Sequence, residues 1–583
     1  MINFARLKDL LASQLSKYFS VAGKALHILF HPIRSVPLQF LLSGLIVLFA
    51  VGFNWVTATR GIYLYDYSIV FDGAWRVLQG QIPYRDFAMS HAPLAYFLLA
   101  AAFKWFGVSF GTFIGFASVL NGIGVLASIR IARRLAPGTE FLVGIVTAVW
   151  YPPIMGFPQI EHVAFCFNFL CLWCLTEFED SKSLTAYFFR FLSGFLLFCA
   201  CMTKQNAGTF FAPILLLYLS FLAFRNLKDK FLSIFVFCCG FAFALSLFLA
   251  WLWLYCDPLL FKHHFFDVPA KFGGDRIARL LSPMQFIYKV VLGITPLSSV
   301  QVLNLFAYLA LGLVFIKLAL RSYSFKGINV SRSSILLGLV LFHYLFCSSM
   351  MNQPESGMPF LGLMAGLTIT LFRETLSGLE LRFTEGHPLE NRLALSSSHS
   401  LLTLPFLMMF VLLFVQGAKI SWQRTANEFT VWTTFLEPIS FPALKPLKWG
   451  APTLQGVSNE FAISSAQFEG LIRFLEKRDQ KFFVFPVSTI LYGLLNKPSP
   501  APWLFFYEGH SFAKEDLPRL DNQAIANFQE LPVCIWVKES DSWIGEHKEL
   551  YKLPKTFAWL NQNFKKVQQF GPYEVLENTS CPK

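Results

Sequence analysis

Long apolar runs occupy most of the first 420 positions of the chain, and short polar stretches separate them. A helix needs about 20 mostly apolar residues to cross the roughly 30 Å hydrocarbon core of a bilayer, so each long run predicts a membrane span. The pattern predicts a polytopic α-helical membrane protein with about eleven transmembrane helices, at 37–57, 109–130, 139–156, 161–178, 187–203, 206–224, 231–256, 300–320, 334–352, 356–372 and 400–420.

Segment 93–106 is apolar but shorter than the other runs. A helix over this segment reaches only about 21 Å at roughly 1.5 Å per residue, which is too short to span comfortably. If the segment lies along the membrane surface, the basic clusters between the other runs all fall on one side, which the positive-inside rule identifies as the cytoplasm. We therefore expect a juxtamembrane helix here. The basic clusters are at 130–134, 225–230, 321–332 and 373–392.

This arrangement divides the chain into a basic cytoplasmic N-terminus, 1–36, and a transmembrane domain, 37–420. The first outer loop, 58–108, and a second large outer loop, 257–299, then lie on the non-cytoplasmic side, together with residues 421–583.

Composition changes sharply after position 420, where Glu, Asp, Lys, Asn and Gln become frequent. A helical period at 464–478 and strand-like runs at 482–487, 533–538, 567–570 and 573–576 predict a small soluble α/β domain.

The whole-chain composition agrees with a membrane protein. Of the 583 residues, 55% are hydrophobic and only 14% are charged, which excludes a soluble, disordered or coiled-coil chain. The net charge of +13 does not indicate nucleic-acid binding, because Lys and Arg lie in clusters between apolar runs. Most cysteines lie inside those runs and are expected to be small core residues. Cys534 and Cys581 could form a disulfide if the tail lies in an oxidising compartment.

Charged groups at the outer ends of spans are the first candidates for a site, because ionisable groups near hydrocarbon are costly. In the first outer loop, apolar residues at 69, 70, 74, 77 and 78 have helical spacing, so we expect an amphipathic helix over 66–80 that Gly80 ends. Asp66 lies at its N-terminal end. The alternative role for Asp66 is an N-cap, worth about 1 kcal/mol.

Three features of the first half of the chain resemble the GT-C glycosyltransferases. They are Asp66 followed by Pro83-Tyr84-Arg85-Asp86 and Pro93-Leu-x-Tyr96, then Pro152-Pro153 and Gly156-Phe-Pro158 before Glu161, and Thr203-Lys204-Gln205 at the end of a span. The branch resembled most contains the bacterial relatives of dolichyl-phosphate-mannose protein mannosyltransferases and the aminoarabinose transferases. The resemblance covers roughly 37–260 and extends to the later spans by topology.

The resemblance implies an integral-membrane glycosyltransferase that passes a sugar from a polyprenyl-phosphate donor to a glycan, lipid or protein acceptor. Asp66 would be the general base, a role that typically contributes about 10²–10⁴-fold. Glu161 would be a second catalytic acid that orients the acceptor or the sugar. Lys204, Arg85 and Arg276 would bind the donor phosphate and stabilise its developing charge.

Further polar residues are expected to contact the acceptor or the lipid. His91 stands where aminoarabinose transferases tend to carry Lys, which argues against that sugar. His263 and His264 are adjacent, and the side chains of consecutive residues point in different directions. No third ligand has suitable spacing, so these two histidines do not predict a metal site. No cofactor is expected, and a divalent ion between Asp66 and Glu161 is the less favoured alternative. The expected contact residues are His91, Gln205, His263, His264 and Glu355.

The alternative function is a lipid-linked sugar transporter or flippase without transferase activity. A transporter would place charges or broken helices near the middle of the membrane, often in inverted repeats, and the sequence has neither. The acidic candidates lie at one face, which favours the enzyme. We expect a multi-pass protein of a bacterial inner membrane with its C-terminal domain in the periplasm; the sugar and the acceptor stay open.

Overall fold

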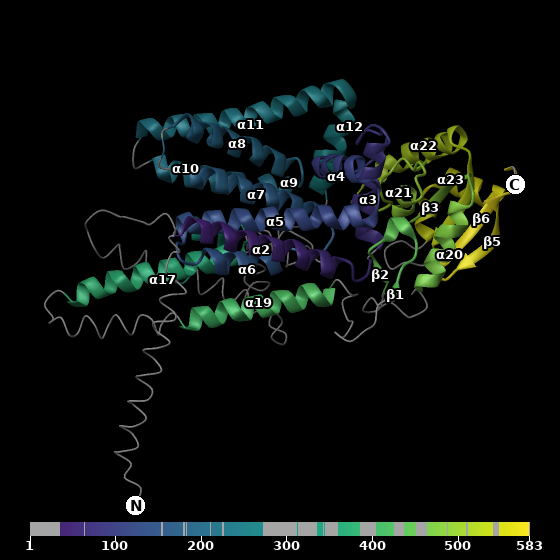
Figure 1. Ribbon diagram of the computed structural model, residues 1–583. Helices are drawn as coiled ribbons and strands as arrows, with labels where there is room; N and C mark the ends of the chain where they lie inside the picture. Colours follow the sequence, from purple (N-terminus) through teal and green to yellow (C-terminus); the bar gives the residue numbers. More distant parts are fainter. Residues whose placement is uncertain are drawn as a thin grey trace, which may run out of the picture.

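The computed structural model describes residues 35–62, 64–152, 156–178, 181, 183–209, 211–223, 227–271, 312, 335–341, 343, 359–384, 404–424, 437–449, 463–486, 488–508, 511–539 and 547–581. A bundle of helices forms one half of the molecule, and a smaller domain with a β-sheet lies at one end of the bundle (Figure 1). The bundle contains α2 (Val36–Ala58), α5 (Phe110–Leu135), α6 (Glu140–Trp150), α7 (Ile160–Glu177), α8 (Leu184–Cys201), α9 (Gln205–Thr209), α10 (Phe211–Ala223), α11 (Leu227–Tyr255), α17 (Leu361–Thr384) and α19 (Leu404–Arg424).

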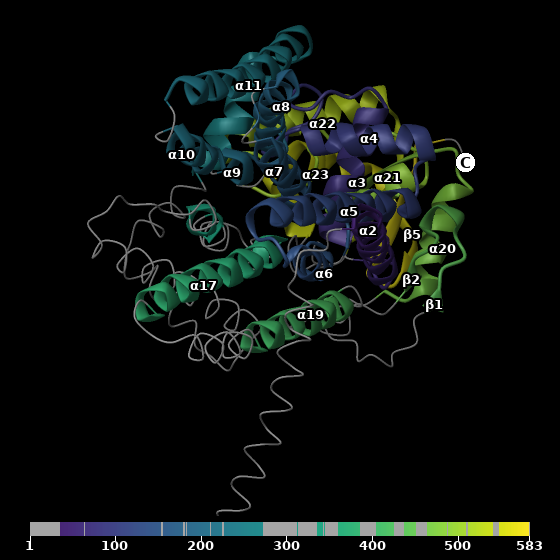
Figure 2. The same ribbon diagram turned by 60° about the vertical axis from the view of Figure 1, so that its left-hand side comes forward.

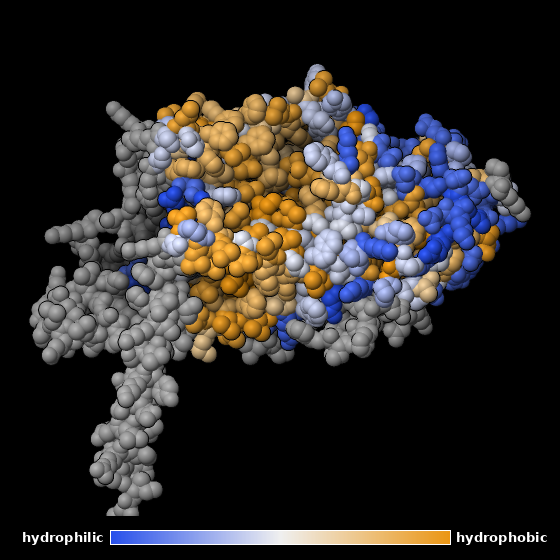
Figure 3. All heavy atoms as spheres, viewed as in Figure 1, coloured by the Kyte–Doolittle hydropathy of each residue, from blue (hydrophilic) through white to orange (hydrophobic). Residues whose placement is uncertain are grey.

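Five helices in the described ranges are long and apolar enough to cross a membrane. They are α2, α5, α7, α8 and most of α11, and they confirm the spans predicted at 37–57, 109–130, 161–178, 187–203 and 231–256. In the space-filling view the surface over the helices is mainly hydrophobic, whereas the C-terminal domain carries most of the hydrophilic surface (Figure 3). The protein is therefore membrane-embedded through this bundle.

The other predicted spans differ from the structure. The span predicted at 139–156 is too long, because α6 ends at Trp150 and the chain turns at Tyr151 before two prolines, whose rings disfavour continued helix. The span predicted at 206–224 is divided between α9 and α10, α17 continues beyond the predicted end at 372, and α19 lies over the span predicted at 400–420. The spans predicted at 300–320 and 334–352 lie largely outside the described residues.

Segment 59–109 starts and ends at the same end of the bundle. Arg60, two positions after the end of α2, forms an isolated β-bridge with Lys448. Gly111, at the start of α5, lies beside the same stretch, with the Lys445 carbonyl oxygen 3.1 Å from where a Cβ would be. Helices α3 (Leu64–Leu78) and α4 (Leu94–Phe106) lie between these points, next to the C-terminal domain (Figure 1). Helix α4 thus does not pass through the bundle, as its length predicts.

Helices α8 and α11 contact each other through two glycines, which we call the glycine seam. A Cβ on Gly194 would lie 1.9 Å from the Phe237 carbonyl oxygen, and a Cβ on Gly240 would lie 1.9 Å from the Phe191 carbonyl oxygen. Small residues let helix backbones approach closely in membrane proteins. The reciprocal contact fixes the two helices against each other, and Lys204 lies three positions after the end of α8.

The C-terminal domain has the α/β character that the sequence predicts. A four-stranded sheet has the order β3-β4-β6-β5; β3 and β4 are parallel, and the other neighbours are antiparallel. A disulfide joins Cys534 in β4 to Cys581, as the sequence suggested. The longer elements are α20 (Ser465–Glu476), β3 (Lys481–Phe485), α21 (Ile490–Leu494), α22 (Leu517–Glu530), β4 (Val533–Glu539), α23 (Pro554–Asn563), β5 (Phe564–Phe570) and β6 (Tyr573–Asn578), and a short pair, β1 (Glu437–Pro438) with β2 (Lys448–Trp449), precedes them.

Candidate functional site

Helix α3 carries the leading candidate, Asp66. The helix ends at Leu78, and Gly80 follows with φ of +85°, a conformation that glycine adopts without strain. Asp66 lies inside the first turn rather than before it, so the alternative role of an N-cap is wrong. Helix α4 packs closely on α3, because a Cβ on Gly73 would lie 2.4 Å from the Tyr96 ring.

Glu161 and Lys204 form an ion pair between two different helix ends. Glu161 lies in the first turn of α7 and Lys204 lies between α8 and α9, and Lys204 Nζ is 2.9 Å from Glu161 Oε1. Each side chain is less than one-fifth exposed, at 17% and 19%. The turn before α7 contacts the end of α2, where a Cβ on Gly156 would lie 2.4 Å from the Ala58 side chain. The structure thus brings together two residues that the sequence predicted separately.

Asp66 interacts electrostatically with both members of this pair. Burial raises the pKa of Asp66 to about 7; the negative charge of Glu161 adds to the increase, and the positive charge of Lys204 opposes it. A carboxyl group with a pKa near neutrality exchanges protons readily at physiological pH. Asp66 therefore has the property that a general base needs.

His91 lies on a loop that is held near Lys204 by several hydrogen bonds. Tyr84 donates its hydroxyl to the His91 carbonyl at 2.6 Å, and Gln205 Nε2 donates to the Ser90 carbonyl at 2.9 Å. The Leu94 backbone N–H also donates to the Met202 carbonyl at 2.9 Å. His91 interacts electrostatically with Glu161, so His91 and Gln205 both belong to the surroundings of the Glu161–Lys204 pair.

The other predicted phosphate ligands are not brought to this pair in the described residues. Arg85 is about half exposed, and its Nε lies 2.8 Å from Asp86 Oδ1 in an ion pair. Arg276 and Glu355 lie outside the described residues. Among the predicted phosphate ligands, Lys204 is thus the one that the structure places beside Asp66.

His263 and His264 lie on a short helical turn, His263–Asp267, that follows α12 (Pro258–Lys262) and contacts the C-terminal domain. His263 Nε2 is 3.0 Å from Asp516 Oδ2, and His264 Nε2 is 3.2 Å from Arg519 Nη2. His263, His264 and Asp516 have potential ligand atoms within 4.8 Å of one another. Asp516 is thus a third potential metal ligand beside the two histidines. Spacing along the chain did not reveal it, because Asp516 is far from them in the sequence. Gln205 Nε2 also donates to the Phe265 carbonyl at 3.4 Å, which connects this turn to the site.

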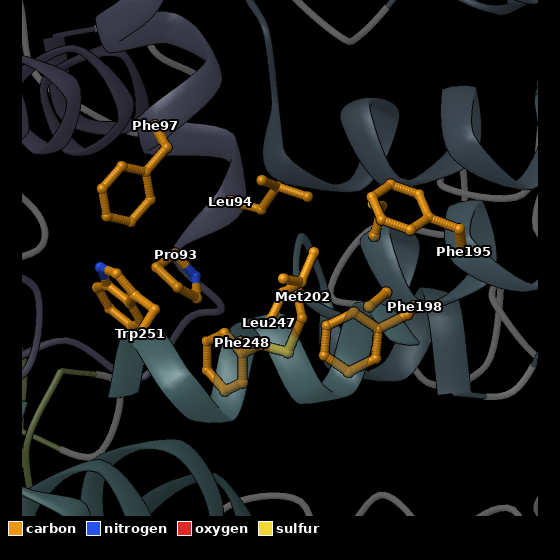
Figure 4. Close-up of a pocket in the computed structure, with 11 residues that line it drawn as sticks. Pro93, Leu94, Phe97, Phe195, Phe198, Met202, Leu247, Phe248 and Trp251 are labelled. Atoms are coloured by element: carbon orange, nitrogen blue, oxygen red, sulfur yellow. The ribbon is translucent and has the colours of Figure 1, made fainter. Parts of the chain in front are cut away.

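An apolar cavity of about 230 Å³ lies beside the polar groups. Its walls come from the start of α4, the end of α8 and the last turns of α11 (Figure 4). Met202 of the wall precedes Lys204 by two positions, and Pro93 follows His91 by two. Helical periodicity did not single out this set, because the three segments meet only in the folded chain. The lining residues are Pro93, Leu94, Phe97, Phe195, Phe198, Cys199, Met202, Ala244, Leu247, Phe248 and Trp251.

Comparison with known proteins identifies the fold. No family model and no curated protein sequence matches the chain. The chain is similar to the crystal structure of ArnT from Cupriavidus metallidurans in the apo state, with a TM-score of 0.51 and 11% identity over 94% of this chain and 100% of that one. The same protein bound to undecaprenyl phosphate matches with a TM-score of 0.49 and 11% identity over 93% of this chain and 100% of that one.

A more distant match is the Archaeoglobus fulgidus oligosaccharyltransferase tethered to an acceptor peptide, with a TM-score of 0.45 and 8% identity over 94% of this chain and 74% of that one. The helical bundle, the juxtamembrane helices α3 and α4 and the C-terminal domain together match apo ArnT over nearly its whole length. The chain therefore has the fold of the GT-C glycosyltransferase superfamily, as its sequence predicts.

Proposed function

We propose that this protein is a membrane glycosyltransferase that moves a sugar from a polyprenyl-phosphate donor to an acceptor hydroxyl. The observation that carries the proposal is Asp66, a carboxyl group with a pKa of about 7 that interacts with the Glu161–Lys204 pair. The fold supports it, and so does the ligand of the similar ArnT structure, undecaprenyl phosphate. The proposed setting is a bacterial inner membrane, with the basic end of the bundle in the cytoplasm and the site outside.

In the proposed reaction the acceptor oxygen attacks C1 of the sugar, and the bond from C1 to the phosphate oxygen breaks with its electron pair on the phosphate. Asp66 takes the proton of the acceptor hydroxyl. Lys204 donates hydrogen bonds to the departing phosphate, where negative charge grows. An ammonium has three N–H donors, so Lys204 can hold Glu161 and a phosphate oxygen together. Glu161 orients Lys204 and raises the pKa of the base.

The apolar cavity is the proposed site for the first part of the prenyl chain. Its lining is formed by aromatic and aliphatic side chains from α4, α8 and α11, and it adjoins the loop and helix end that carry His91 and Lys204. A lipid phosphate at Lys204 would therefore have apolar surface next to it. We propose that no resident metal takes part, because Lys204 supplies positive charge beside Asp66.

The test compares a strain that lacks the gene with strains that carry the wild-type or variant chain. Mass spectrometry of envelope glycolipids and secreted proteins would identify the product that disappears on deletion. Asp66→Asn should fail to restore this product while still binding polyprenyl phosphate, and the control Asp267→Asn, which changes a carboxylate that pairs with Lys262 at 2.9 Å, should restore it. Full restoration by Asp66→Asn would exclude the proposed base. Donor flipping without any sugar transfer would indicate a transporter instead.

A further inference from the structure

The C-terminal domain packs directly against the helix that carries the proposed base. Figures 1 and 2 both show α3 beside α21. Gly493 of α21 lies on Phe71, because a Cβ at position 493 would be 2.7 Å from the Phe71 ring. The Ile490 backbone N–H donates to Ser68 Oγ at 3.3 Å. Ser68 follows Asp66 by two positions, so this contact lies within one helical turn of the base.

A buried ion pair fixes the other end of α3 to the same domain. Asp72 and Arg76 are 0% and 1% exposed, and Arg76 Nε lies 2.9 Å from Asp72 Oδ2. Arg76 Nη1 donates to the Ala501 carbonyl at 2.6 Å, and Nη2 donates to Ser499 Oγ. One guanidinium thus makes three charge-assisted hydrogen bonds, one within α3 and two to the C-terminal domain.

Neighbouring contacts extend this attachment. Trp75 Nε1 donates to the Lys497 carbonyl at 2.9 Å. The Ala88 backbone N–H donates to the Pro502 carbonyl at 2.9 Å, and the Leu504 N–H donates to the Ala88 carbonyl at 3.1 Å. The stretch 490–504 therefore binds both α3 and the loop that leads to His91.

The first turn of α3 also contacts the turn that leads to Glu161. The Tyr67 ring lies 4.6 Å from the Phe157 ring, measured between centroids. Helix α3 thus contacts two surfaces, one that precedes Glu161 and one from the C-terminal domain. A shift of the second surface would change the position of Asp66 relative to the Glu161–Lys204 pair.

From these contacts we infer that the C-terminal domain sets the position of the catalytic helix, and that Arg76 is the positioning residue that transmits this constraint to Asp66. The inference rests on the proposed function. It gives the soluble domain a role in the chemistry without requiring any of its side chains to touch the substrate.

The experiment uses the full-length chain with Arg76→Gln, Arg76→Lys and the control Arg473→Gln. Arg473 lies in the C-terminal domain itself, is about half exposed, and has its partners, Ser440 and Glu469, in the same domain. Rates are expressed per folded molecule, with the folded fraction measured by size-exclusion chromatography. Arg76→Lys keeps the charge beside Asp72 but lacks the planar fork, so it provides a second variant if Arg76→Gln does not fold.

For Arg76→Gln we expect kcat to fall by roughly 10²-fold, the size of effect that a misplacement of about 1 Å can cause, while the donor KM is unchanged. Arg76→Lys should give an intermediate kcat. The midpoint of the pH–rate profile should move to lower pH, because a displaced Asp66 is less buried. Hydrogen exchange should accelerate in peptides from 64–78, and Arg473→Gln should change none of these quantities.

Asp66→Asn, measured in parallel, separates a failure of the positioning role of Arg76 from a failure of the proposed function. If Asp66→Asn is inactive and both Arg76 variants keep the wild-type kcat and pH midpoint per folded molecule, the positioning role is wrong and the proposed base remains. If Asp66→Asn is fully active, the proposed function is wrong, and the positioning role is overturned with it.

Discussion

Lys204 Nζ lies 2.9 Å from Glu161 Oε1, so the cation proposed to receive the donor phosphate is already bound to a carboxylate. The two residues come from different helix ends, and each is largely shielded from water. This pair holds the ammonium in one place before the donor arrives. A preformed cation stabilises developing charge without reorganising during the reaction.

The first prediction concerns Lys204 itself. Lys204→Gln should lower kcat by roughly 10²–10³-fold, the range measured when one group that stabilises a developing anion is removed. Lys204→Arg should keep more activity because it retains the charge. Initial rates of sugar transfer by the purified protein check this, with Lys262→Gln as the control, since Lys262 is 64% exposed and pairs with Asp267. Equal rates for Lys204→Gln and the wild type would contradict the phosphate role.

The second prediction concerns pH. Asp66 must be deprotonated to accept a proton, and burial raises its pKa to about 7, so kcat/KM should rise with pH and level off above about 7. Glu161→Gln removes a charge that raises the pKa of Asp66 and leaves Lys204 to lower it. The midpoint should therefore move to lower pH in Glu161→Gln and to higher pH in Lys204→Gln. If the midpoints stay at the wild-type value in both variants, the charges of Glu161 and Lys204 do not control the pKa of Asp66.

The third prediction concerns the apolar cavity. Ala244→Phe should fill part of the cavity and raise the KM for a long-chain polyprenyl-phosphate donor several-fold, whereas a donor with a short chain should be affected less. Ala242→Phe is a matched control, because Ala242 lies on the exposed face of the same helix. A comparison of donor KM values for the two chain lengths checks this. Identical KM values in both variants would place the prenyl chain elsewhere.

The fourth prediction concerns metal. Treatment with EDTA should leave the transfer rate unchanged, because Lys204 provides the positive charge at the proposed reaction centre. In the described ranges, His263, His264 and Asp516 form a group whose ligand atoms lie close enough together to hold an ion. A rate that falls on chelation and returns with zinc would overturn the metal-free mechanism. Loss of the same response in Asp516→Asn would assign the ion to that group.

Local patterns predicted part of the elements. Apolar runs of sufficient length predicted α2, α5, α7 and α8, and short strand-like runs predicted β3, β4, β5 and β6. The length of 93–106 predicted that α4 would not cross the bundle. The end of α6 was misjudged because apolar side chains continue after Trp150 while the backbone turns ahead of two prolines.

The candidate site was predictable to the extent that it depends on span ends. Asp66, Glu161 and Lys204 each lie near a helix end, and the predicted direction in which each span crosses the membrane places those three ends on the same side. Asp516 beside His263 and Ser499 beside Arg76 were not predictable, because each partner is hundreds of positions away and on a different domain. Such pairs arise from how the two domains pack, which no periodicity encodes.

The glycine seam between α8 and α11 also sets a path for the lipid. At Gly194 and Gly240 the two backbones touch, so a prenyl chain has no room to pass between these helices at that depth. The cavity lies nearer the site, where larger side chains of the same two helices and of α4 form its walls. The seam lies next to the cavity, because Gly194 directly precedes Phe195 of the cavity wall. A long prenyl chain bound in the cavity, as proposed, would therefore have to leave it by a route other than the gap between α8 and α11 at the seam.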